Sequence, residues 1–152
     1  MVNKTLAEHL LTEPTRRQVV NAISTLIEIE VRQTRGTRGL AMRRLYQMIT
    51  QEHPDIIQDA VSELMDDWVG VLEPYYALYL HSAHDTHFDA FVTTEKENLG
   101  RELISVVKTR LQSSTHRIAR LTRGLLSPRL IKQALPRLGR IVEHHTMKPT
   151  HA

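Results

Sequence analysis

Residues 130–142 read LIKQALPRLGRIV, and their apolar side chains recur at intervals of three and four residues. This spacing places the apolar residues on one face of an α-helix, and that face needs another element to cover it. Residues 19–31 and 99–111 show the same period. Clear runs of strict apolar–polar alternation, which would indicate strands, are missing. The pattern therefore predicts an all-α protein.

Residues that favour helix ends divide the chain into nine expected helices. Thr5, Thr86 and Thr94 are each followed three residues later by a carboxylate, the spacing of a capping box. Ser127 precedes a proline that suits a first helical position, whereas Pro136 lies inside a helical stripe and predicts a kink or break there. The expected ranges are about 5–12, 15–34, 38–52, 54–70, 73–82, 86–93, 95–112, 115–126 and 128–145.

The chain also resembles itself. Residues 54–61 (PDIIQDAV) align with residues 128–135 (PRLIKQAL) at an offset of 74, which also relates Leu64 to Leu138. We therefore expect two degenerate multi-helix repeats, about 5–70 and about 86–145, joined by a linking helix at about 73–82. Neither repeat would bury its own apolar faces. The prediction is a single all-helical domain over residues 1–145, a bundle or short solenoid, with a loose tail at 146–152.

Composition excludes several classes of protein. The 152 residues contain no cysteine, which excludes disulfide scaffolds, zinc ribbons, iron–sulfur clusters and thiol nucleophiles. No run of apolar residues approaches the ~18–20 that a membrane span needs, and no signal peptide begins the chain. We expect a cytoplasmic protein that does not bind membranes.

Charge is strongly segregated along the chain. Residues 51–100 hold one basic and eleven acidic side chains, and residues 101–140 hold ten basic and one acidic. The net charge of +3 hides these opposed segments. Such segregation favours pairing of the segments within one chain or between chains. The leading prediction is a non-enzymatic helical interaction protein that forms a homo-oligomer, or binds another protein, through its acidic and basic faces.

The basic segment 101–140 also suggests a second alternative, nucleic-acid binding. Arginines at helical spacing can follow a phosphate backbone. Nucleic acid is disfavoured as a partner because this segment contains no aromatic residue for base stacking and the acidic segment opposes it. The candidate basic face comprises Arg110, Arg117, Arg120, Arg123, Arg129, Arg137 and Arg140.

Aromatic, acidic and histidine residues gather in residues 68–91, between the two expected repeats. The first alternative function is therefore a small-ligand or metal-binding site there, since seams between repeats often hold pockets. The candidate pocket comprises Trp68, Glu73, Tyr75, Tyr76, Tyr79, Phe88 and Phe91. Candidate metal ligands, of types that suit zinc, nickel or iron, are His81, His84, Asp85, His87 and Asp89.

Catalysis and cofactors find little support. No glycine-rich phosphate loop, nucleophile elbow or Walker lysine is present, and the histidine spacing differs from that of a zinc hydrolase. Histidine-rich loops and tyrosine-bearing core helices account for the same residues without a ligand. We predict no catalytic residue and no cofactor.

Three stretches carry a resemblance that spans nearly the whole chain: TLAEHLL at 5–11, LEPYYALY at 72–79 and ALPRLGRIVEHH at 134–145. Together they resemble an uncharacterised actinobacterial family, classed as a domain of unknown function. The resemblance implies an all-helical, single-domain, cytoplasmic protein and brings no activity, ligand or catalytic residue. The histidines at 81, 84 and 87 are not part of that family's pattern, which weakens the metal interpretation.

Overall fold

The computed structural model describes residues 5–82, 86–112 and 125–146, with no side-chain placement for 111–112. Within these residues the chain forms helices and no strand, which confirms the predicted all-α class. The helices are α1 (Leu6–Leu10), α2 (Thr15–Gln33), α3 (Gly36–Glu52), α4 (Ile56–Ser82), α5 (Phe88–Thr94), α6 (Lys96–Gln112) and α8 (Pro128–Thr146). Residues 115–124 of the helix expected at 115–126, and nearly all of the expected tail, lie outside the described residues.

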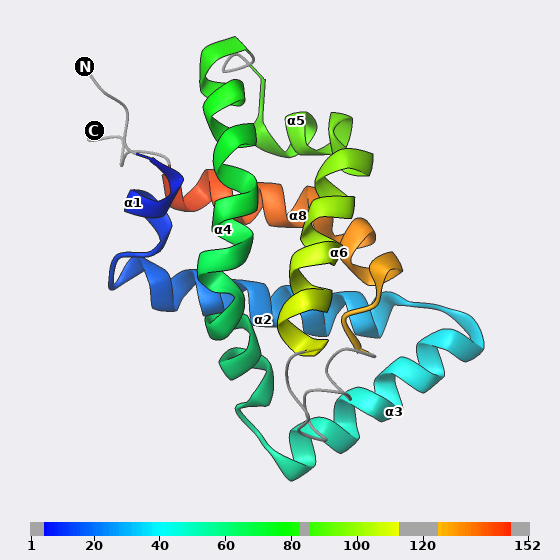
Figure 1. Cartoon of the computed structure of the whole chain (residues 1–152). Helices are drawn as coiled ribbons and strands as arrows, with labels where there is room; N and C mark the ends of the chain where they lie inside the picture. Colours follow the sequence, from blue (N-terminus) through cyan, green and yellow to red (C-terminus); the bar gives the residue numbers. More distant parts are fainter. Residues whose placement is uncertain (1–4, 83–85, 113–124, 147–152) are drawn as a thin grey trace, which may run out of the picture.

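Four long helices form two crossed layers (Figure 1). In that view α4 and α6 run side by side in front of α2 and α8, and each of the four contacts both helices beside it in the ring α2–α4–α6–α8. The short helix α1 lies against α4 and α8, while α5 lies against α8. Helix α3 extends away from these layers and connects the far ends of α2 and α4.

Helix α4 corrects the prediction of two helices at 54–70 and 73–82. It is one helix that continues through Pro74, so there is no separate linking helix. A proline inside a helix removes one N–H donor and displaces the carbonyl four residues earlier, here that of Gly70. Both Gly70 and Pro74 lie on the exposed side of α4. Water can therefore bind the displaced carbonyl there, and the helix tolerates the proline.

Helix α8 likewise continues through Pro136, so the break predicted there is wrong. Its start agrees with the sequence: Ser127 Oγ accepts a hydrogen bond from the Leu130 amide at 3.3 Å, and Pro128 is the first helical residue. Gly139 allows α5 to approach closely, because a Cβ atom at this position would lie 2.9 Å from the Cα atom of Asp89. Helix α8 thus contacts α5 as well as its neighbours α2 and α6 in the crossed layers.

The predicted caps of the short helices are partly correct. Thr5 and Glu8 form the expected capping box at α1. Thr86 and Thr94 do not begin helices: His87 precedes α5, and Thr94 is the last residue of α5. The α5 N-terminus is instead met by a carboxylate from α8.

One connected apolar core includes buried residues from both halves of the chain. All seven described helices contribute, for example Leu6 of α1, Met42 of α3, Phe88 of α5 and Val142 of α8. The described helices therefore pack on one another around one continuous core. Among the described residues, no helix combines the length and the apolar character needed to cross a bilayer.

Candidate functional site

A cavity of about 100 Å³ lies between α2, α4, α6 and α8, and we call it the four-helix cavity. The described residues that line it are all apolar. Nine of them are buried and form its inner wall: Ile23, Leu26, Ile27, Val61, Leu64, Trp68, Leu103, Leu130 and Ala134.

The cavity is partly open to solvent. Its other lining residues belong to α6, to α8 and to the residues just before α8, and they are half-buried: Val106, Val107, Leu126, Ile131 and Leu138. These side chains mark the mouth.

Trp68 is the polar-tipped residue in this apolar wall. Its side chain is almost completely buried, and its indole Nε1 atom has no hydrogen-bond partner in the structure. Among the described residues it is the sole buried side-chain nitrogen or oxygen atom in that condition. The two other buried polar side chains are satisfied, because Ser24 donates to the Val20 carbonyl at 2.8 Å and Glu30 binds Arg137. A buried donor without a partner costs about 1–3 kcal/mol of folding free energy.

Ion pairs join the four helices around the cavity in a closed ring. Each pair connects neighbours in the order α2–α4–α6–α8–α2, and three of the four lie largely in solvent. The pairs are Arg16–Asp66 (3.3 Å), Asp67–Arg110 (2.8 Å), Glu97–Lys132 (3.1 Å) and Arg137–Glu30 (3.0 Å). Exposed pairs contribute little stability individually, about 0.2–1 kcal/mol. Their arrangement fixes which helices are neighbours.

Glu30 differs from the other members of this ring because it is buried. Its side chain is 3% exposed, and it accepts a hydrogen bond from Arg137, which also binds Gln33. Burial raises the pKa of Glu30 above its usual value, and the Arg137 charge opposes that rise. The pair therefore joins α2 to α8, and its cation is already engaged.

Most of the predicted pocket residues pack against one another instead of lining this cavity. The rings of Tyr76, Tyr79, Phe88 and Phe91 are in contact, with centroids 5.0–6.4 Å apart. Tyr79 also donates to the Thr86 carbonyl at 2.6 Å. These four residues form an aromatic cluster between α4 and α5, and of the seven predicted pocket residues Trp68 alone lines the four-helix cavity.

The two remaining predicted pocket residues make polar contacts. Tyr75 donates a hydrogen bond to Glu102, and burial together with this bond raises the pKa of Tyr75 to about 12. Glu73 caps α1, since its carboxylate accepts from the backbone N–H groups of Leu6 at 2.7 Å and Ala7 at 3.1 Å. Neither residue is among the described residues that line the four-helix cavity.

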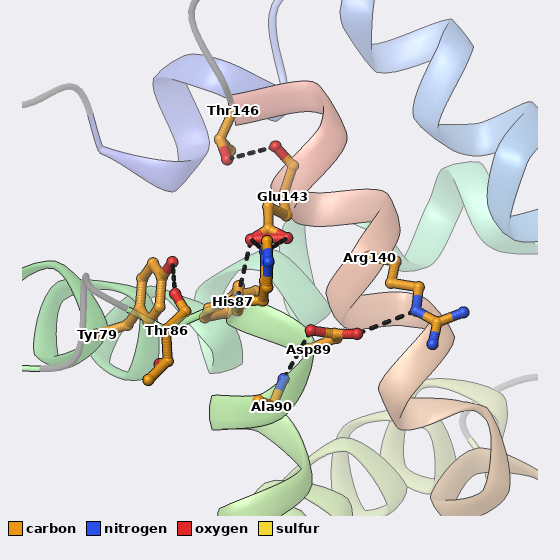
Figure 2. Close-up of polar contacts among 9 residues, drawn as sticks. Tyr79, Thr86, His87, Asp89, Ala90, Arg140, Glu143 and Thr146 are labelled. Carbon is orange, nitrogen blue, oxygen red and sulfur yellow. Dashed lines mark hydrogen bonds and ion pairs between the residues drawn. The ribbon is translucent and has the colours of Figure 1, made fainter.

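Two of the five predicted metal ligands, His87 and Asp89, lie at the junction of α5 and α8, which Figure 2 shows. His87 Nδ1 lies 3.3 Å from the Glu143 carboxylate, which also accepts the Phe88 N–H at 3.0 Å. Asp89 binds Arg140 at 3.0 Å, and this hydrogen bond lowers the pKa of Asp89. His81 is exposed at the end of α4.

His84 and Asp85 lie outside the described residues, so the complete metal site stays a prediction. In the part of the chain that the structure describes, no group of three or more histidine and carboxylate side chains is arranged to hold a metal ion. Sequence reasoning missed Glu143, because its capping role depends on α8 lying beside α5.

The predicted basic face is divided among several helices. Arg110, Arg137 and Arg140 pair with acidic residues of the same chain, and Arg129 is exposed. Arg117, Arg120 and Arg123 lie outside the described residues. Within the chain, Arg110, Arg137 and Arg140 thus have acidic partners, and pairing between chains stays a prediction.

The sequence carried a partial signal for the cavity. The helical stripes at 19–31, 99–111 and 130–142 include six of its nine inner-wall residues, and Val61 and Leu64 lie in the repeated segment. A stripe shows that a face is buried and does not show how completely the facing stripes fill the space.

Comparison with known proteins gives a family and no described relative. A family model described as "Family of unknown function (DUF6918)" matches residues 6–146. Neither the curated proteins nor the solved structures contain a significant match to the chain.

Proposed function

The chain belongs to that family of unknown function, and from its own geometry we propose that it binds a small, uncharged apolar molecule in the four-helix cavity. The observation that carries the proposal is a partly open cavity of about 100 Å³ whose described lining is entirely apolar. An apolar cavity of ~150 Å³ stays dry and binds benzene in another protein, so this volume with an open mouth suits a compound of similar size.

The energetic cost of the cavity supports this proposal. An unfilled apolar cavity costs about 24 cal/mol per Å³, or roughly 2 kcal/mol for this one. Substituting a larger side chain at a lining position such as Ala134 would remove part of that cost. The fold retains a cavity that a larger side chain could fill, and it also retains a buried donor without a partner. Together these two avoidable costs favour a functional role for the cavity.

Benzene is the first probe for this site. Trp68 is the only tryptophan in the chain, so its fluorescence reports binding directly. We expect benzene to change Trp68 emission and to raise the unfolding temperature, corresponding to about 2.7 kcal/mol at a hundredfold excess over the dissociation constant. Unchanged emission and an unchanged unfolding temperature would contradict the proposal.

A pair of variants provides the control. Ala134→Leu adds an isopropyl group to the inner wall, so it should abolish the effect of benzene while the protein stays folded. Ala77→Leu makes the same change on the exposed side of α4 and should leave the effect intact. An equal response in both variants would place benzene elsewhere.

Self-association is the second candidate function. It is favoured by α3, where Leu40 and Met48 are 46% and 43% exposed and Arg44 lies between them on the same side. The internal ion pairs leave less charge to drive association than the sequence suggested. Light scattering at low and high salt tests this candidate: a monomer at both would contradict it.

The two-repeat organisation also stays a proposal. It is supported by the way α4 and α8 each cap a short helix of the same half of the chain, through Glu73 at α1 and Glu143 at α5. The non-enzymatic role and the cytoplasmic location stay predictions.

A further inference from the structure

We infer that the molecule bound in the four-helix cavity carries a neutral hydrogen-bond acceptor, such as a ketone or ester oxygen, which pairs with the Nε1–H group of Trp68. This inference rests on the proposed function and adds the chemical class of the ligand. It makes Trp68 the residue that determines specificity in an otherwise non-directional site.

The need for an acceptor follows from the chemistry of indole. Its N–H is a donor only, so an acceptor alone can satisfy it. The described cavity lining offers none, since its side chains are all apolar. The backbone carbonyls of α4 around Trp68 are engaged in the helix, and no other partner reaches Nε1.

Water does not meet this need well. A buried water is retained when it has about two to four polar partners. In this cavity a water beside the indole would have one donor and an apolar wall. A ligand oxygen differs because the rest of its molecule gains from contact with that wall.

The acceptor is neutral because the described lining of the cavity offers no cation to balance a charge. Arg137, on the wall helix α8, is bound to Glu30 and Gln33 of α2. Burying a carboxylate without a paired cation would cost far more than one hydrogen bond returns. A fatty-acid or phosphate headgroup is therefore unsuited to this position.

Access to Nε1 requires a small movement of the indole. The atom is buried, so pairing with an acceptor in the cavity requires the indole ring to turn toward it.

Two probes of nearly the same shape test the inference: cyclohexanone, which has a carbonyl oxygen, and methylenecyclohexane, in which a CH₂ group replaces it. Because Trp68 is the sole tryptophan, the protein gives one indole N–H resonance in an NMR spectrum. We expect cyclohexanone to shift this resonance downfield and to slow its exchange with solvent. Methylenecyclohexane should bind without either effect.

Affinities in two variants complete the test. Trp68→Phe removes the donor, and the preference for the ketone over the alkene should fall by roughly fivefold relative to wild type, the value of one neutral hydrogen bond. Leu64→Val changes the same wall without removing the donor and should keep the preference. Comparing ratios between variants cancels the different hydration of the two probes. If Trp68→Phe does not fold, the NMR comparison in the wild-type protein decides alone.

The outcomes separate the two proposals. Binding of both probes with the same small change in the indole resonance overturns the inference and leaves the proposed function standing. Binding of neither probe overturns the proposed function together with the inference. A downfield shift confined to cyclohexanone supports both.

Discussion

At α5 the aromatic rings contact one another and the backbone N–H of Phe88 meets a carboxylate, whereas at the four-helix cavity an indole N–H has no partner and the wall encloses empty space. Both regions draw on residues 68–91. The α5 region shows the close packing and satisfied polar groups that stabilise a fold. The cavity lacks both features. The difference fits the proposed function, in which Trp68 and its neighbours bind a ligand while residues 86–94 stabilise the fold.

Truncation of the aromatic cluster should have the largest effect. Phe88 is 1% exposed and contacts three other rings, so Phe88→Ala should lower the free energy of unfolding by about 3–5 kcal/mol, measured by urea denaturation. Val107→Ala, at the half-buried mouth of the cavity, should cost much less. Equal losses would remove the contrast in packing between the two regions.

The carboxylate cap of α5 should have the next largest effect. Glu143→Ala leaves the Phe88 N–H without its acceptor and should cost about 0.5–2 kcal/mol, as the loss of a helix cap does. Glu143→Gln keeps an acceptor oxygen and should cost less. Faster hydrogen exchange at the Phe88 amide in Glu143→Ala would locate the effect, and unchanged exchange and stability would contradict the capping role.

The two regions should respond to acid with opposite signs. Glu30, on α2, has a raised pKa, so this carboxyl group holds its proton more tightly in the native protein than in the unfolded chain. Its contribution to stability is fully present below the usual value of 4.5 and is lost as the pH rises through the folded pKa above it. Wild type should therefore lose stability relative to Glu30→Gln as the pH rises through this range.

Asp89, at the α5–α8 junction, has a lowered pKa. Its contribution is present above its usual value of 3.8 and is lost as the pH falls through the folded pKa below it. Wild type should lose stability relative to Asp89→Asn on acidification in that range. Urea titrations at a series of pH values measure both differences, and the same sign for the two residues would contradict the assignment.

The smallest effect should come from the exposed part of the ion-pair ring. Glu97→Gln breaks the contact with Lys132 and should cost about 0.2–1 kcal/mol at low salt. The loss should almost vanish at ~1 M salt, where the screening length falls to ~3 Å. A loss above about 2 kcal/mol that salt does not change would contradict the weak, screened contribution expected of this exposed pair.

Much of the architecture follows from the sequence alone. The three- and four-residue spacing of apolar residues predicted an all-α protein, and Thr5 and Ser127 predicted two helix starts correctly. Helix α4 was predicted as two helices, yet it continues through Pro74. The helix tolerates Pro74 because this residue faces solvent. That position depends on which side of α4 the core covers.

The candidate site was predicted less completely. Aromatic and acidic residues around Trp68 indicated a pocket, yet Tyr76, Tyr79, Phe88 and Phe91 pack into one another. The charged segments were visible in the sequence, but the partners of Arg110, Lys132 and Arg137 were not. Those partners lie on helices that the fold brings together from distant parts of the chain.

The sequence by itself determined the helical class, the buried faces of the helices and the opposite charges of the two segments, because each depends on neighbours a few residues apart. The tertiary structure decided that α2, α4, α6 and α8 leave a cavity, that Trp68 Nε1 has no partner there, and that ion pairs close a ring around it. The physical reason is that periodicity specifies which faces meet. The volume left between four meeting faces depends on all their side chains at once.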